Sequence, residues 1–278
     1  GSYHTAIGFE ALKTVTTGQQ LVAVGRQALA LNTTGSQNTA CGYSALYSNT
    51  TGGSNTAAGY SALYSVTTGD NNTGFGRDTL YFTTTGSDNT AIGNEALENN
   101  TASGNTAVGS HAMVANTTGS NNTAVGNGAL DANVTNVSNC AFGNSALTNS
   151  TSDYNNAFGD GALSTLTTGN KNCAFGYQSL DHVTTGSNNS AFGHQTATAI
   201  TTGGYNVALG DRTLYKQTTT SYNTAIGYAA AYNNTSGDYL VAVGSGAMFS
   251  NTTGANNTAV GRDALTSNTT ASNVTAIG

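Results

Sequence analysis

The chain has 278 residues and a net charge of −6, and only 7% of its residues are charged. The acidic balance excludes the basic surface that nucleic-acid binding requires, so we expect no nucleic-acid partner. No apolar run is long enough to cross a bilayer, so we expect no membrane insertion, and the first residues, GSYHTAIGFE, show no signal peptide.

A repeat of 17 residues runs through the chain from Gly8 to Gly278. The Gly that closes each Thr-Ala-Val-Gly-like segment occurs 17 times; 14 of the 16 intervals are 17 residues long and two are 16. Ala precedes this Gly by two residues in 16 of 17 copies, and Leu follows it by four residues in 12 of 16. The repeat predicts a single array over residues 1–278, with no linker and no second domain.

Each repeat contains two short apolar clusters. In chain order, the first ends at the Gly, as at 39–41, and the second is an Ala-Leu pair, as at 45–46. A Thr-Thr-Gly turn, as at 50–52, then leads to the next repeat. Both clusters are too short for a helix, so we expect each coil to hold two short strands and two turns. The sequence therefore predicts an all-β, parallel β-solenoid, or β-roll, of about 17 stacked coils.

Stacking of identical residues explains why the chain has so few charges. A column of like charges at the spacing of neighbouring strands repels itself. Columns of Asn and Thr can instead hydrogen-bond from one coil to the next. We therefore expect the Asn and Thr of the repeat to form ladders along the stack.

The apolar pattern predicts which residues lie inside. Neighbouring strand residues point to opposite faces, yet Ala and Val are adjacent, and so are Ala and Leu. We expect the small Ala columns to fill the interior and the Val/Ile/Phe or Leu columns to face outward. Long apolar columns need cover, so we expect self-association, with a closed homotrimer favoured.

Two other arrangements fit the same pattern. In one, the larger apolar residues lie inside and the Ala columns form the interface. In the other, the protein is a monomeric solenoid with a wider core. Four aromatic residues recur in one column and indicate core or interface: Phe142, Phe158, Phe175 and Phe192.

The ends of the chain lack polar caps. It starts part-way through a repeat, lacks an initiator Met and stops at Thr-Ala-Ile-Gly. Solenoids normally carry capping repeats, because an open strand edge invites pairing. We therefore expect a processed or excised segment of a longer fibre, or coils that stack end to end as a filament.

The Thr-Ala-Val-Gly-x-x-Ala-Leu unit resembles the head repeats of trimeric autotransporter adhesins, with their Ala-Ile-Gly-x-x-Ala signature. The longer unit at Asn38–Gly52 is similar to repeat arrays in bacterial and phage tail-fibre-like proteins. The resemblance covers the whole chain. It implies left-handed parallel β-rolls that assemble as trimers on bacterial surfaces, and, for the fibre-like arrays, an intramolecular chaperone domain that follows them.

The sequence shows no pattern typical of catalysis or metal binding. Cys140 and Cys173 lie two coils apart in one column, about 9.6 Å by the strand spacing, which exceeds disulfide reach; Cys41 lies in the apolar column. The four His fall in different columns, with no metal-ligand spacing. No base recurs beside a Ser or Thr. We therefore expect no catalytic residues, no cofactor, no metal and no enzyme activity.

We expect a structural or adhesive extracellular fibre, on a cell surface or a virion, that self-associates and presents a surface to a glycan or receptor. One alternative is an ice-binding solenoid that uses Thr ladders, although the adjacent Thr pair, as at 33–34, is expected to point one side chain out and one in. Another is glycan recognition by the tyrosines that follow the Gly: Tyr43, Tyr60, Tyr177 and Tyr228. Asn-x-Ser/Thr sequons are also numerous, for example at Asn32, Asn49, Asn116, Asn251 and Asn268, as the composition alone would produce.

Overall fold

The structure is a computed structural model that describes residues 3–278. It contains 17 β-strands and, in that range, no helix. The chain divides into two compact units, Gly1–Asn139 and Cys140–Gly278. Both units are parallel β-solenoids, so the predicted fold class is confirmed. One strand is contributed by each repeat.

The strands are short and evenly spaced. The first unit contains β1 (His4–Ile7), β2 (Leu21–Val24), β3 (Thr39–Cys41), β4 (Thr56–Ala58), β5 (Thr73–Phe75), β6 (Thr90–Ile92), β7 (Thr106–Val108) and β8 (Thr123–Val125). The second contains β9 (Cys140–Phe142), β10 (Asn156–Phe158), β11 (Cys173–Phe175), β12 (Ser190–Phe192), β13 (Val207–Leu209), β14 (Thr224–Ile226), β15 (Val241–Val243), β16 (Thr258–Val260) and β17 (Thr275–Ile277).

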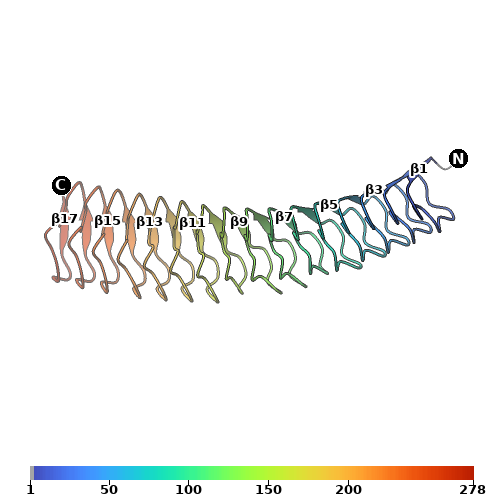
Figure 1. The fold of residues 1–278 in the computed structure, drawn as a ribbon. Coiled ribbons are helices and arrows are strands. Elements are labelled where there is room, and N and C mark those ends of the chain that lie inside the picture. The colour runs from blue at the N-terminus through green and yellow to red at the C-terminus, as the bar shows by residue number, and fades with distance from the viewer. Residues whose placement is uncertain (1–2) are drawn as a thin grey trace. The chain divides into compact units, whose positions relative to one another are not determined.

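Within each unit, every strand pairs in parallel with the strand of the next coil (Figure 1). The register places equivalent residues side by side, as Ala40 beside Ala57 and Phe158 beside Phe175. The deletions in the 16-residue repeats leave this register intact, because Ala91 still pairs with Ala107. Identical residues therefore stack in columns, as the sequence predicts.

The prediction of two strands per coil is wrong. The Ala-Leu cluster is a turn, in which Leu46 has a φ of 51° and Ser44, two residues earlier, also has a φ of 51°. Backbone hydrogen bonds still join successive coils there, since Leu46 N–H donates to Ala62 O at 3.0 Å. The left-handed residues bend the chain where a strand would continue straight.

Three residues per coil occupy this left-handed region. They stand two and four residues after the Gly, and five residues before the next one, as Ser44, Leu46 and Ser54 do in one coil. No Val, Ile or Thr occupies such a position in the described chain, although all three are common elsewhere in it. Branching at Cβ makes this conformation unfavourable, so the sequence avoids it where the backbone requires it.

The buried apolar core consists mainly of two Ala columns and the Leu column. The strand alanines, such as Ala57, and the Ala-Leu pair, such as Ala62 and Leu63, are fully buried. The prediction of Ala inside is confirmed. The prediction that Leu columns face outward is wrong, because two adjacent residues can point the same way when the backbone is not extended. The rival arrangement is right for the Leu column, which lies inside, and wrong for the Ala columns, which are buried in the same core and not at an interface.

The repeated Gly permits the close approach of successive coils. Gly42 has a φ of 148°, and a Cβ there would lie 2.2 Å from the carbonyl oxygen of Gly59 in the next coil. No side chain fits at that distance. The Gly that marks the repeat is therefore required by both conformation and space.

Buried asparagines complete the interior, and we call the column four residues before the Gly the Asn spine. Asn72 N–H donates to Asn55 Oδ1 at 2.8 Å, and Asn55 Nδ2 donates to Gly69 O at 2.8 Å. Asn55 thus joins two backbone groups of the next coil, as do most other asparagines of the spine, and these bonds satisfy polar atoms that burial would otherwise make costly. The prediction that Asn side chains form hydrogen bonds from one coil to the next is confirmed.

A second column, the Asn ladder, stands seven residues after the Gly. Asn49 Nδ2 donates to Asn32 Oδ1 at 2.6 Å, and Asn116 Nδ2 donates to Asn100 Oδ1 at 2.7 Å. Apolar residues interrupt this column. Where Val66 follows Asn49, the Asn49 Oδ1 is buried and has no hydrogen-bond partner.

The Thr columns also join the coils. Thr33 Oγ1 donates to Thr50 O at 2.9 Å, and the same contact recurs at Thr50 and Thr67. These bonds run from side chain to backbone. The prediction that one Thr of the pair points inward is wrong here, because Thr33 is half-buried and Thr34 is exposed.

Candidate functional site

The side of the strands that faces away from the core carries a continuous apolar column in both units. We call it the outer face, made of the residues one and three before each repeated Gly, which share a side because strand residues alternate. Phe75 is 45% exposed and Ile92 is 41% exposed. The residues one before the Gly are Ile7, Val24, Cys41, Ala58, Phe75, Ile92, Val108 and Val125 in the first unit, and Phe142, Phe158, Phe175, Phe192, Leu209, Ile226, Val243, Val260 and Ile277 in the second.

Four phenylalanines stack on the outer face of the second unit. The ring centroids of Phe142 and Phe158 are 4.9 Å apart, those of Phe158 and Phe175 4.3 Å, and those of Phe175 and Phe192 5.0 Å. Phe142 and Phe192 are exposed. The Phe column is therefore not part of the core; it forms an apolar ridge on the surface.

Threonines follow the outer face of the first unit beside the apolar column. The sheet register pairs six of them in sequence: Thr39, Thr56, Thr73, Thr90, Thr106 and Thr123. Their side chains are half-buried. A regular Thr column thus lies on the strands of the first unit, in addition to the Thr column at the Thr-Thr-Gly turn.

The tyrosines that follow the Gly are exposed, and two of them stack. Tyr43 and Tyr60 have ring centroids 5.1 Å apart, and Arg26 lies over the Tyr43 ring at 5.6 Å. Tyr177 stacks on His194 at 5.4 Å, and Tyr228 is exposed. The sequence therefore placed these four residues at the surface correctly.

Sequence reasoning missed other aromatic stacks. Tyr47, Tyr64 and Tyr81 stand five residues after the Gly and stack with centroids 5.2 Å and 5.0 Å apart. In the second unit, Tyr215, Tyr232 and Phe249 stack in the same repeat position. The sequence did contain a sign of these stacks, because the aromatic residues are 17 positions apart and the register of the coils therefore makes them neighbours.

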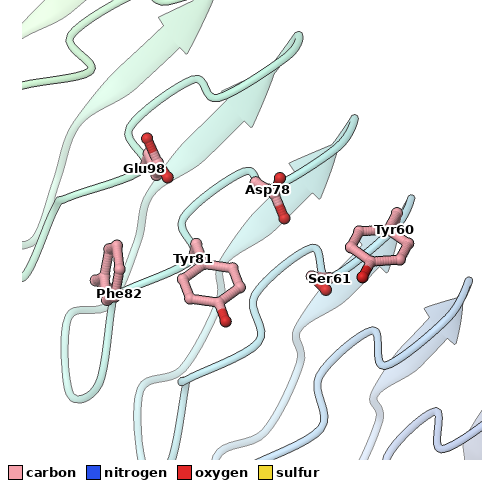
Figure 2. Close-up of a pocket in the computed structure, with 6 residues that line it drawn as sticks. All are labelled: Tyr60, Ser61, Asp78, Tyr81, Phe82 and Glu98. Carbon is pink, nitrogen blue, oxygen red and sulfur yellow. The ribbon is translucent and has the colours of Figure 1, made fainter.

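A groove lies beside Tyr60 and Tyr81, the last rings of the two tyrosine stacks of the first unit (Figure 2). Its volume is about 350 Å³, within the range of small-molecule sites. In this view Ser61 and Asp78 lie between the rings of Tyr60 and Tyr81. The groove is lined by Tyr60, Ser61, Asp78, Tyr81, Phe82 and Glu98, which come from the turns after β4, β5 and β6.

The groove is acidic. Arg77 Nε lies 3.4 Å from Asp78 Oδ2, and the Arg77 guanidinium also pairs with Glu95. Burial raises the pKa of Asp78, against the opposing effect of Arg77. Burial also raises the pKa of Glu98, with further repulsion from Glu95 and Asp78. Among the described residues, no cation or side-chain donor is bonded to the Glu98 carboxylate.

Histidines and carboxylates meet at two places that sequence spacing did not indicate. His111 Nε2 lies 3.1 Å from Glu95 Oε2, and His194 Nδ1 lies 3.5 Å from Asp211 Oδ1. Each pair is about one repeat apart, so the stacking of coils creates the contact. Within residues 3–278, no three His, Cys, Asp or Glu side chains gather in a way that could hold a metal ion.

The three cysteines are free thiols. Cys140 and Cys173 both pair in register with Asn156, on its two sides, which confirms that they lie two coils apart. Burial raises the pKa of both thiols, so they are poor nucleophiles.

Four of the five sequons named above hold buried side chains. Asn32, Asn49, Asn116 and Asn251 are fully buried in the Asn ladder, and their amide nitrogens donate hydrogen bonds. A glycan cannot be attached there in the folded state. These sequons therefore reflect the composition of the ladder.

A search of residues 3–278 finds no helix with the length and apolar character needed to cross a membrane. Comparisons of the chain with known protein families, with curated proteins and with solved structures find no match.

Proposed function

We propose that this chain is a structural, adhesive part of an extracellular fibre, on a cell surface or a virion, without enzyme activity. The observation that carries the proposal is the apolar column of the outer face, one residue before each repeated Gly. It continues through every strand of each unit, and exposed apolar surface of this extent usually marks an interface. Each unit is therefore suited to being buried against further copies of itself.

A closed homotrimer satisfies this requirement best. Three copies around one axis can each turn the outer face inward, and the closed symmetry leaves no apolar column in water. The repeat also resembles that of adhesin heads and tail-fibre-like proteins, for which trimers are expected. In this arrangement the loops face solvent and can contact a glycan or receptor.

Sedimentation of the purified protein tests the proposal. Equilibrium ultracentrifugation at several concentrations is expected to give three times the monomer mass of 27.9 kDa. A folded monomer, with a β-type circular dichroism spectrum at all concentrations, would contradict self-association.

Ice binding is a second candidate, and one observation favours it. The six threonines from Thr39 to Thr123 form a regular column on the strands of the first unit, where the surface is flatter than at the turns. Phe75 projects from the same face and interrupts its flatness. A thermal-hysteresis measurement decides between the two: activity that is lost in a Thr90→Lys variant supports ice binding, and no hysteresis excludes it.

A further inference from the structure

We propose that the groove lined by Tyr60, Asp78, Tyr81, Phe82 and Glu98 binds an organic ammonium cation. This inference goes beyond the proposed fibre function and does not depend on self-association. It rests on three features of the groove: aromatic rings where the stacks end, an unpaired carboxylate beside them, and a net negative charge.

Three aromatic rings line the groove. Tyr60 ends the Tyr43–Tyr60 stack and Tyr81 ends the Tyr47–Tyr64–Tyr81 stack, because the next residues in these two columns are Arg77 and Glu98. Phe82 meets Tyr81 edge-on, with centroids 4.8 Å apart. The face of an aromatic ring attracts a cation, and several rings around one cavity attract it more strongly.

The side chain of Glu98 also lines the groove. It replaces tyrosine in the column of Tyr81, so it lies one coil beyond that ring. Asp78 and Glu95 already share the guanidinium of Arg77, whereas Glu98 pairs with no cation in the described part of the chain. A cation beside Tyr81 would give Glu98 the partner that it lacks.

The local charge favours a cation over other ligands. Three carboxylates, those of Asp78, Glu95 and Glu98, outnumber the single guanidinium of Arg77. Anionic ligands are therefore repelled. A neutral sugar gains only hydrogen bonds from the carboxylates, but an ammonium group gains charge attraction from Glu98 and attraction to the rings together.

The second unit offers an internal comparison. Tyr228 and Phe249 occupy the repeat positions of Tyr60 and Tyr81, so aromatic rings are present there too. Gly246 and Thr266 occupy the positions of Asp78 and Glu98, so these two carboxylates are absent, while Asp263 stands at the position of Glu95 and pairs with Arg262. The combination of rings and acids distinguishes the groove of the first unit from this equivalent surface.

Choline is the probe for the experiment, and 3,3-dimethylbutan-1-ol is its neutral counterpart of the same shape. Ligand-observed NMR titrations of the full chain, at constant ionic strength, give the affinity for each. We expect saturable choline binding with a Kd on the order of millimolar, and binding of the neutral counterpart at least about fivefold weaker, which is roughly 1 kcal/mol. Methyl glucoside is the saccharide control and is expected to bind more weakly than choline.

Two variants locate the site. Glu98→Gln removes the charge and keeps the shape, and Tyr81→Leu removes the ring; each is expected to weaken choline binding about fivefold or more, again roughly 1 kcal/mol. Phe249→Leu, at the equivalent position of the second unit, is the matched control and is expected to leave the affinity within about twofold.

Three results overturn the proposal. Equal binding of choline and its neutral counterpart shows a merely apolar groove, and tighter binding of methyl glucoside shows a saccharide site. No saturable binding of choline shows that the groove takes no ammonium ligand. The comparison of the two probes uses the unaltered protein, so it decides the charge requirement even if a variant fails to fold.

Discussion

The side-chain oxygen of Asn38 accepts a hydrogen bond from the backbone N–H of Asn55 at 2.8 Å, across one turn of the solenoid. Asn38 Nδ2 donates to Gly52 O at 2.7 Å. One buried side chain therefore connects to two backbone groups of the next coil. This arrangement recurs along the Asn spine, so the polar column in the interior holds successive coils together.

Replacing a spine residue is expected to be costly. Asn55→Ala leaves Asn72 N–H and Gly69 O without their side-chain partners, and each unsatisfied buried group costs about 1–3 kcal/mol, so we expect a loss of roughly 2–5 kcal/mol in the free energy of unfolding. Asn144→Ala, at an exposed position, is the control and is expected to change stability by less than about 0.5 kcal/mol. Denaturant unfolding measures both. Equal effects of the two substitutions would show that the spine contributes nothing specific.

The gap in the Asn ladder gives a second prediction. Val66→Asn places an amide donor beside the unpartnered Asn49 Oδ1, whereas Val183→Asn places the same amide between Leu166 and Ile200. Both valines are fully buried at the same repeat position. We expect Val183→Asn to be more destabilising by about 1 kcal/mol, because its amide can donate to Gly186 O, as Asn49 donates to Gly52 O, but its side-chain oxygen and second N–H find no partner in the neighbouring coils. A Val66→Asn variant that unfolds as readily as Val183→Asn is the opposing result.

The repeated Gly gives a third prediction. Gly42→Ala brings a Cβ to 2.2 Å from Gly59 O, while Gly161→Ala, which also has a positive φ, meets only Gln178 Cγ at 3.4 Å. We expect a loss of at least about 3 kcal/mol for Gly42→Ala and about 1 kcal/mol for Gly161→Ala, where only conformational strain applies. Thermal unfolding of both variants tests this. Similar melting temperatures would mean that the coils can separate to admit a methyl group.

The outer face gives a fourth prediction. Phe175→Lys puts a charge in the middle of the Phe ridge, and the proposed trimer is expected to dissociate while the solenoid keeps its β spectrum. Tyr239→Lys is the control, because Tyr239 lies away from the outer face and Lys171 already occupies its repeat position. Sedimentation and circular dichroism report the two properties separately. A Phe175→Lys protein that stays trimeric places the interface elsewhere.

The acidic groove gives a fifth prediction, on pH. Burial, followed by repulsion from Glu95 and Asp78, holds the folded-state pKa of Glu98 above its unfolded value. The ionised form therefore opposes folding above that pKa, and the penalty disappears as the pH falls below the unfolded pKa. We expect Glu98→Gln to raise the melting temperature at pH 7 and to have no effect near pH 3.

Glu10 provides a control, because its pKa is shifted in the direction opposite to that of Glu98. Hydrogen bonds from Lys13 and then Gln27 hold its pKa below the usual value, so its contribution to stability is present at neutral pH and lost as the pH falls through the folded pKa. Glu10→Gln is therefore expected to lower the melting temperature at pH 7. Melting curves of both variants from pH 3 to 7 test the two signs together.

Much of the fold could be predicted from the sequence because its cause is periodicity. The recurrence of Gly42 and Gly59 at one period indicates stacked coils, and stacking of identical residues accounts for the scarcity of charge. The Ala two before each Gly was correctly placed inside, since three strand residues around Ala57 alternate in direction. Even the left-handed positions had a signal, in the absence of Val, Ile and Thr there.

The rest was decided by the tertiary structure. Alternation of faces holds only for extended backbone, so it misplaced Leu46, whose left-handed φ turns it inward beside Ala45. The groove at Tyr60 and Glu98 depends on how far apart different columns lie around one coil, which a period along the chain does not encode. The sequence by itself determined which residues stack. The folding of each coil decided which stacks face one another, because that depends on the backbone angles at the three left-handed positions of the coil.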